Sequence, residues 1–92
     1  MSERRATIMA ASGLHARPAS RFTQAAAASG HAVTIGRAGE PGVLASSILM
    51  VMGLRLQHGE QVVLSAPGAS AAPALAALAD LLGTDLDAAD ET

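Results

Sequence analysis

The chain has 92 residues, half of them hydrophobic, and its only aromatic residue is Phe22. This size fits one domain over residues 1–92, with a core of aliphatic and alanine side chains. Cysteine is absent, which excludes disulfides, thiol catalysis and cysteine-ligated metals and fits a cytoplasmic location. The apolar stretches are too short for a secretory signal or a membrane span, so we expect neither.

Charge is unevenly distributed along the chain, although the net charge is only −2. Five of the eight acidic residues follow residue 79, whereas all six basic residues are arginines that precede residue 56. A modest basic surface without interleaved aromatic residues does not favour nucleic-acid binding. Arginine does suit two-pronged contact with carboxylates and phosphates. The acidic end of the chain, from about residue 84, is expected to fray.

The first half of the chain predicts strands around one helix. Residues 5–10 alternate between apolar and polar side chains, which predicts a strand. Residues 16–29 are rich in alanine, carry apolar side chains at helical spacing and predict a helix that ends at Gly30. Residues 31–36 alternate again, and a turn-rich segment then leads to a short returning strand at residues 43–44.

The middle of the chain predicts a second helix and another strand. Ser46 or Ser47 can cap a short helix that runs through residues 48–56. Residues 57–60 then form a turn, and residues 61–66 alternate as a half-buried strand should.

The last predicted element is a helix that Ser70 caps, with Pro73 in its first turn and Gly83 at its end. Its large apolar side chains form one stripe, made of Leu75, Leu78 and Leu82. The resulting order, β-α-β-β-α-β-α, has too few strands for a doubly wound fold. It predicts an α+β open-faced β-sandwich, a four-stranded antiparallel sheet covered on one face by three helices.

His15 stands where the first helix is expected to begin. The first turn of a helix has backbone N–H groups without intrahelical partners and carries the positive end of the helix dipole. Pro18 fits this placement because its missing N–H is not needed there. A phosphoryl group on His15 would accept hydrogen bonds from the amides of Ala16 and Arg17 and pair with the Arg17 guanidinium. On position alone, a surface histidine without chemistry is the simpler alternative.

Residues 13–19, GLHARPA, resemble the phosphorylation motif of HPr, the histidine-containing phosphocarrier of the bacterial sugar phosphotransferase system. Residues 47–54 resemble the second motif of that family, a serine that opens a short helix, and the resemblance covers nearly the whole chain. It implies a carrier that is not itself an enzyme. His15 would accept a phosphoryl group on Nδ1 from phosphorylated enzyme I, which took it from phosphoenolpyruvate, and pass it to IIA domains of sugar transporters. Arg17 would stabilise the phosphoryl group, and neither a metal nor an organic cofactor is implied.

A carrier that meets two partners through one face needs an exposed apolar patch with a charged rim. The second predicted helix holds more large apolar residues than so short a helix can bury, so part of it should face outward near His15. Methionine suits a surface that meets several partners, and arginines steer acidic ones. The expected docking residues are Ser20, Arg21, Ile48, Leu49, Met52, Leu54 and Arg55.

The resemblance also implies a regulatory site at Ser47, because in some members of the family the equivalent serine is phosphorylated by an ATP-dependent kinase. A phosphate there would place negative charge in the docking face. A purely structural helix cap explains the same serine. His31 and His58 lie in separate turns without ligand-like spacing, so we expect no metal site.

Two other functions are compatible with the same sequence features. A regulatory binding module would use the same face, and a nitrogen-related or fructose-specific relay would use the same chemistry. A relative that had lost phosphotransfer would be expected to lose the histidine, whereas this chain keeps His15 and Arg17. We therefore expect a monomer that binds enzyme I, IIA domains and, in the alternative, regulatory proteins, with no nucleic acid and no membrane insertion.

Overall fold

The computed structural model describes residues 1–84, which form a four-stranded sheet and three α-helices. In chain order the elements are β1 (Ser2–Thr7), α1 (Ala16–Ala28), β2 (Thr34–Arg37), β3 (Val43–Leu44), α2 (Ile48–Gly53), β4 (Gln61–Ala66), a 3-10 turn η1 (Ala69–Ala71) and α3 (Ala72–Leu82). Within these residues, no helix is both long enough and apolar enough to cross a membrane. The predicted fraying at the acidic end concerns residues beyond the described part of the chain.

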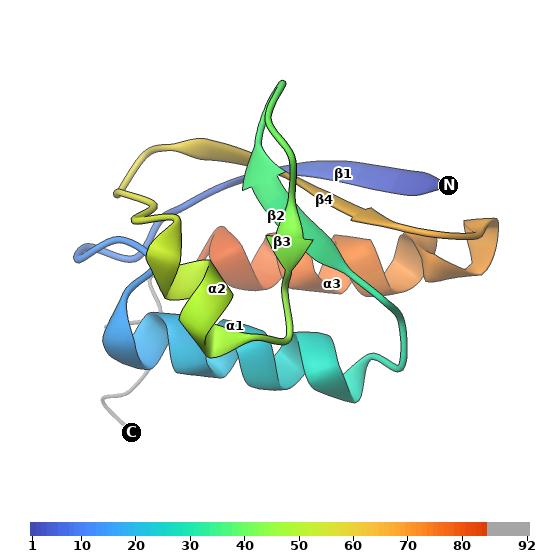
Figure 1. Ribbon diagram of the computed structural model, residues 1–92, viewed down its shortest axis with the longest axis horizontal. Helices are drawn as coiled ribbons and strands as arrows, with labels where there is room; N and C mark the ends of the chain where they lie inside the picture. Colours follow the sequence, from blue (N-terminus) through green and yellow to red (C-terminus); the bar gives the residue numbers. More distant parts are fainter. Residues whose placement is uncertain (85–92) are drawn as a thin grey trace.

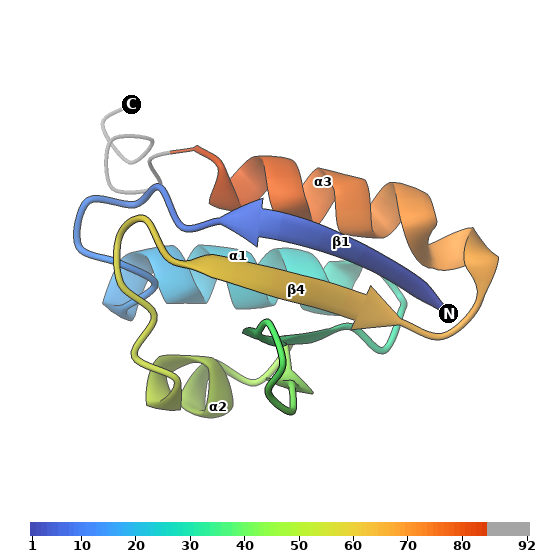
Figure 2. The same cartoon turned by 90° about the horizontal axis from the view of Figure 1, so that it is seen from above.

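The sheet has the strand order β1-β4-β2-β3, and all neighbouring strands are antiparallel. β4 is central and pairs with β1 from Ser2 opposite Ala66 to Thr7 opposite Gln61. Figures 1 and 2 show α1 and α3 side by side against one face of the sheet, while the other face is uncovered. α2 packs against α1 and β3. The predicted α+β open-faced sandwich is confirmed.

The core lies between the sheet and the helices, as the alternation of β4 shows. Val62, Leu64 and Ala66 are buried, whereas the residues between them are more exposed. The predicted leucine stripe of α3 is buried as well. The largest fully buried side chains include Phe22, Ile8, Leu14, Ile35, Leu56, Leu64, Leu75 and Leu82.

The boundaries of the first two strands differ from the prediction, since β1 starts at Ser2 rather than at residue 5 and β2 ends at Arg37 rather than at residue 36. β1 ends at Thr7 rather than at residue 10, because the Met9 N–H leaves the sheet and donates to the carbonyl of Leu82 at 3.0 Å. β2 begins at Thr34 rather than at residue 31, because the Val33 N–H donates to the carbonyl of His31, which closes a tight turn there. The alternation of side chains nevertheless predicts the correct buried faces.

Some helix ends differ from the prediction as well. α1 ends as expected, with Gly30 in the left-handed region at φ +77°. α2 stops at Gly53 instead of continuing to residue 56. The predicted capping by Ser70 is wrong, because the chain first forms η1 and α3 starts after Ala71. Serine is a good cap only where the chain enters the helix from extended backbone, and here a 3-10 turn precedes it.

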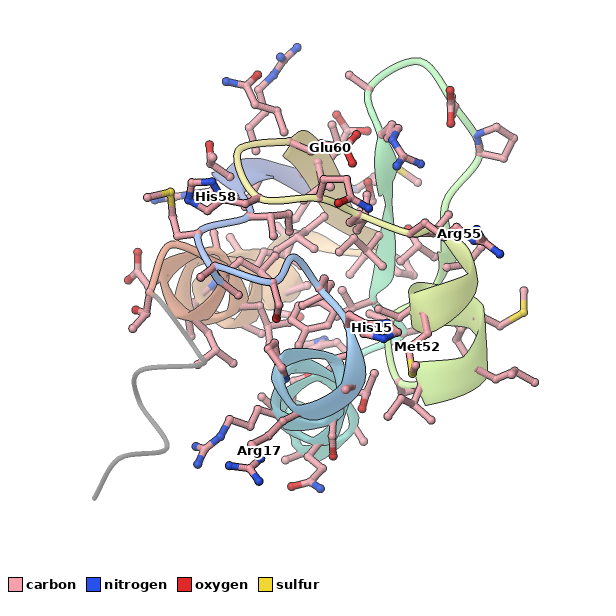
Figure 3. The ribbon with its side chains drawn as sticks, turned by 90° about the vertical axis from the view of Figure 1, so that its left-hand side faces the viewer. His15, Arg17, Met52, Arg55, His58 and Glu60 are labelled. Atoms are coloured by element: carbon pink, nitrogen blue, oxygen red, sulfur yellow. The ribbon has the colours of Figure 1, made fainter. Side chains whose placement is uncertain are left out.

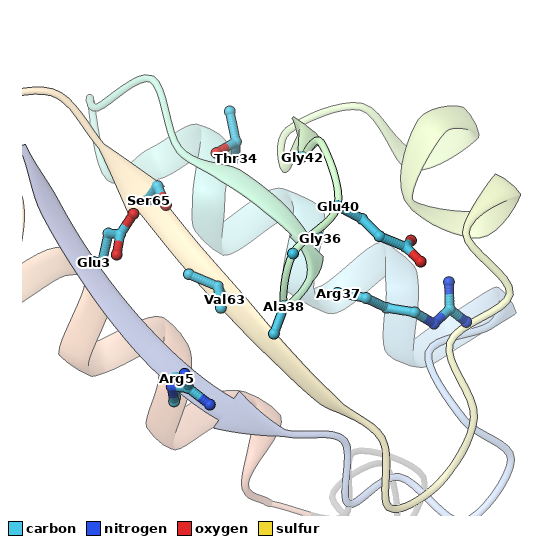
Figure 4. A pocket seen from close by; sticks show the side chains of 11 residues that line it. Glu3, Arg5, Thr34, Gly36, Arg37, Ala38, Glu40, Gly42, Val63 and Ser65 are labelled. Atoms are coloured by element: carbon cyan, nitrogen blue, oxygen red, sulfur yellow. The ribbon is translucent and has the colours of Figure 1, made fainter.

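The hairpin between β2 and β3 projects beyond the sheet (Figure 1), and its residues 38–42 are all exposed. It folds back closely at its base, where a Cβ on Gly36 would lie 2.9 Å from the Cα of Gly42. Between the hairpin and the open face of the sheet lies a hollow of about 290 Å³ (Figure 4). Glycines and short side chains line most of it.

Candidate functional site

His15 is the N-cap residue of α1. Its backbone is extended, with φ −139° and ψ 150°, and its side chain is exposed and makes no capping hydrogen bond. Its N–H donates to the carbonyl of Gly13 at 3.0 Å. The imidazole is therefore presented at the start of the helix without being used to complete it.

The two residues before His15 fix its position. Gly13 has φ +80°, and a Cβ on it would lie 2.4 Å from the carbonyl oxygen of Leu56, so only glycine fits there. Leu14 is buried, and its N–H donates to the same carbonyl at 2.9 Å. The exposed histidine thus follows directly on a residue that is packed and hydrogen-bonded.

The residues after His15 turn the chain sharply into α1. Ala16 has φ +48°, a left-handed conformation that costs a residue with a side chain about 1–2 kcal/mol. Pro18 and Ala19 are then buried, and Pro18 needs no hydrogen-bond acceptor in the first turn. The strained turn separates the exposed His15 from the buried Pro18 and Ala19.

His15 lines a depression of about 520 Å³ between the start of α1, α2 and the loop that follows α2. Figure 3 shows the imidazole next to Met52, with Arg55 farther out. Of the expected docking residues, the depression brings together Leu49, Met52 and Arg55. The depression also includes Leu14, Gly53, Leu56 and Gln57, and no periodic pattern in the sequence connects these residues to the histidine.

α2 leaves three of its large apolar side chains exposed. Ser47 is its N-cap and accepts a hydrogen bond from the Met50 N–H at 3.4 Å, so Ser47 rather than Ser46 is the cap. Val51 is the helix's one buried residue. Three side chains face outward, with exposed fractions of 41% for Ile48, 79% for Leu49 and 49% for Met50.

Two of the expected apolar docking residues are less exposed than Ile48 and Leu49. Met52 and Leu54 are only partly exposed, because they pack against the core. Met50, which is not in the expected set, is exposed as well.

The polar residues expected around His15 come from α1. Ser20 is half-buried, and its hydroxyl accepts a hydrogen bond from Gln24 Nε2 at 3.2 Å. Arg17 and Arg21 are exposed. Figure 3 shows that Arg17 extends away from the imidazole, so its guanidinium reaches the ring only after rotation about its side-chain torsions.

One ion pair near the depression has no local signal in the sequence. Arg37 and Glu60 are 23 residues apart in sequence, and Arg37 Nε lies 2.7 Å from Glu60 Oε1. The hydrogen bonds from Arg37 and from the Gln57 N–H lower the pKa of Glu60 to about 2. The same pair raises the pKa of Arg37 above its ordinary value. Glu60 therefore carries a negative charge at the end of the loop that joins α2 to β4.

The other two histidines lie apart from each other in the sequence and the structure. His31 follows α1 and is half-buried, and His58 is exposed in the turn before β4. Across residues 1–84, no group of three histidine, cysteine, aspartate or glutamate side chains is placed to hold a metal ion.

The comparisons with known proteins agree with this geometry. The family model described as "PTS HPr component phosphorylation site" matches residues 2–84. The chain belongs to the HPr family. A phosphocarrier protein HPr of Streptomyces coelicolor is 47% identical over 92 residues, which is 100% of this chain and 99% of the relative. One from Haloferax volcanii is 46% identical over 83 residues, which is 89% of this chain and 93% of the relative.

A solved HPr structure shows that the fold is also shared. The crystal structure of HPr-C-His from Thermoanaerobacter tengcongensis superposes with a TM-score of 0.83 at 34% identity and covers 95% of this chain and 97% of that one. The chain is therefore an HPr phosphocarrier of the phosphotransferase system, a phosphoryl carrier rather than an enzyme. HPr membership implies partners within that relay.

Proposed function

We propose that His15 is the residue that carries the phosphoryl group. The observation that supports this most directly is an exposed imidazole at the N-cap of α1, held by the buried Leu14 and free of any capping hydrogen bond. In the transfer, the Nδ1 lone pair attacks phosphorus, an N–P bond forms, and the bond between phosphorus and the donor breaks with its electron pair remaining on the donor. The second transfer runs the same exchange from His15 to the acceptor, and no other reactant is consumed.

The start of α1 would stabilise the phosphorylated form. The amides of Ala16 and Arg17 belong to the first turn, where the positive end of the helix dipole favours an anion. Each such hydrogen bond contributes on the order of 1 kcal/mol. Arg17 would rotate toward the phosphoryl group and pair with it, because its side chain is exposed.

We propose phosphorylated enzyme I as the donor and IIA domains of sugar transporters as acceptors, with the exchange in the cytoplasm, where phosphoenolpyruvate is formed. Both partners would dock on one face, made of the depression and the outward side of α2. The exposed Ile48, Leu49 and Met50 would supply its apolar centre, and Arg55, which lines the depression, would add an exposed cation. This division resembles protein interfaces in general, which have an apolar core and a polar rim.

The test is the intact mass of the protein after incubation with phosphoenolpyruvate, Mg²⁺ and a bacterial enzyme I. We expect a gain of one phosphate that is lost in mild acid, as a phosphoramidate should be. The matched control is His15→Ala, which removes an exposed side chain without a hydrogen bond to the helix and should fold normally.

Two results would contradict the proposal. A folded wild-type protein that gains no phosphate with several enzyme I preparations would leave a binding module as the better explanation of the exposed face. A gain that survives in His15→Ala would place the phosphoryl group on another residue.

A further inference from the structure

A two-pronged ion pair lies beside the loop that joins α2 to β4. Arg37 Nε donates to Glu60 Oε1 at 2.7 Å, and its Nη2 donates to Oε2 at 3.0 Å. Figure 4 shows Arg37 turned away from the open face of the sheet and toward this loop. Two parallel hydrogen bonds fix the plane of the guanidinium as well as its distance. The pair therefore holds the guanidinium in one orientation at the end of β2.

The same two side chains hold the backbone of residues 55–57. The Gln57 N–H donates to Glu60 Oε2 at 2.7 Å, and Arg37 Nη2 donates to the carbonyl of Arg55 at 3.4 Å. Gln57 Nε2 donates to that carbonyl as well, at 3.0 Å. One ion pair thus ties down both ends of this three-residue segment.

The segment requires such support because its first residue is strained. Arg55 has φ +53°, a left-handed conformation that costs a residue with a side chain about 1–2 kcal/mol. A strained conformation persists only where surrounding contacts determine it. The donors on the Arg55 carbonyl hold the peptide in the direction that this conformation requires.

The segment in turn supports the residues before His15. Its middle residue, Leu56, is buried, and its carbonyl accepts the Leu14 N–H at 2.9 Å. The backbone of Gly13 packs directly against that carbonyl, so the two loops cannot shift independently. Arg55 and Gln57 also line the depression that contains His15. Residues 55–57 therefore support the backbone before His15 and also form one wall of the depression that contains it.

We propose that Arg37 and Glu60 are positioning residues for phosphoryl transfer at His15. They touch neither the imidazole nor its phosphoryl group, and they act through the backbone of residues 55–57 and the hydrogen bond from Leu14 to Leu56. This inference rests on the proposed function of His15. Loss of either partner would let Arg55 relax to a right-handed conformation and move the Leu56 carbonyl, and with it the histidine.

The experiment compares initial rates of phosphorylation by enzyme I for the wild type, Arg37→Gln, Glu60→Gln and the double variant, each shown to be folded at the assay temperature. We expect each single variant to lower kcat/KM about tenfold, since small displacements of reacting groups slow transfer strongly. The double variant should lose no more than the worse single one, because both act as one unit. The amide NMR signals of Leu14 and His15 should shift in every variant.

Arg5→Gln is the matched control, because Arg5 is an exposed arginine on β1, beside the hollow of the open face, and should leave rate and signals unchanged. Arg37→Lys keeps the charge and tests the site if the other variants fold poorly; it should recover part of the rate. Folded variants with wild-type kcat/KM and unmoved Leu14 signals would overturn the inference while leaving His15 as the carrier. A wild type that takes up no phosphoryl group would overturn the proposed function itself.

Discussion

The two helices beside His15 differ in how far they bury their apolar side chains. α1 has 13 residues and buries a stripe that includes Pro18, Phe22 and Ala26. α2 has 6 residues and buries only Val51, while Leu49 is 79% exposed. The same kind of apolar side chain therefore stabilises the fold on one helix and remains available to partners on the other. The contrast teaches that hydrophobicity along a sequence does not by itself distinguish stability from recognition.

The largest predicted effect is a loss of stability on α1. Phe22 is fully buried, and Phe22→Ala should lower the free energy of unfolding by about 3–5 kcal/mol through lost burial and a cavity. Chemical denaturation of the wild type and the variant measures the difference. Phosphorylation of the molecules that remain folded should be little changed, because Phe22 does not line the depression. A loss below about 1 kcal/mol would contradict the packing described for α1.

A smaller and different effect is expected on α2. Leu49→Ala should leave the free energy of unfolding within about 0.5 kcal/mol, because an exposed side chain contributes little to the core. It should raise the KM of enzyme I for the carrier about tenfold, as loss of a central interface residue does, and change kcat little. Unchanged KM with intact folding would remove Leu49 from the docking face, and a large loss of stability would remove the contrast between the helices.

The smallest effect concerns the pH dependence of stability that the ion pair of Arg37 with Glu60 causes. The pKa of Glu60 is lowered to about 2 in the folded protein, so its contribution to stability is complete above the ordinary glutamate pKa and is lost as the pH falls toward 2. Stability measured from pH 6 to pH 3 should fall less steeply in Glu60→Gln than in the wild type. Identical slopes would mean that Glu60 is not held by Arg37 and Gln57 in solution.

Local patterns in the sequence predict most of the fold. Alternation at residues 61–66 and the leucine spacing of α3 depend on one face meeting the core, and both match the structure. Strand ends depend instead on distant hydrogen-bond partners. The Met9 N–H donates to the carbonyl of Leu82, and no local pattern indicates that partner. The buried faces were therefore predictable from the sequence, whereas the hydrogen-bond partners at the strand ends were not.

The functional site likewise has parts that the sequence predicts and parts that it does not. The motif around His15 and the capping serine of α2 are short segments with their own sequence signals, so both were predictable. The ion pair of Arg37 with Glu60 joins two strand ends that only the folded sheet brings together. The left-handed conformation of Arg55 has no signal at all, because arginine has no preference for it.

The exposed hairpin of residues 38–42 has a practical consequence for watching the relay at work. The chain contains no cysteine, so Ala38→Cys would give each molecule a single thiol for a fluorescent label. The hairpin does not line the depression around His15, and a dye there would leave the docking face of α2 uncovered. Energy transfer to a labelled partner would then report each encounter directly, one molecule at a time.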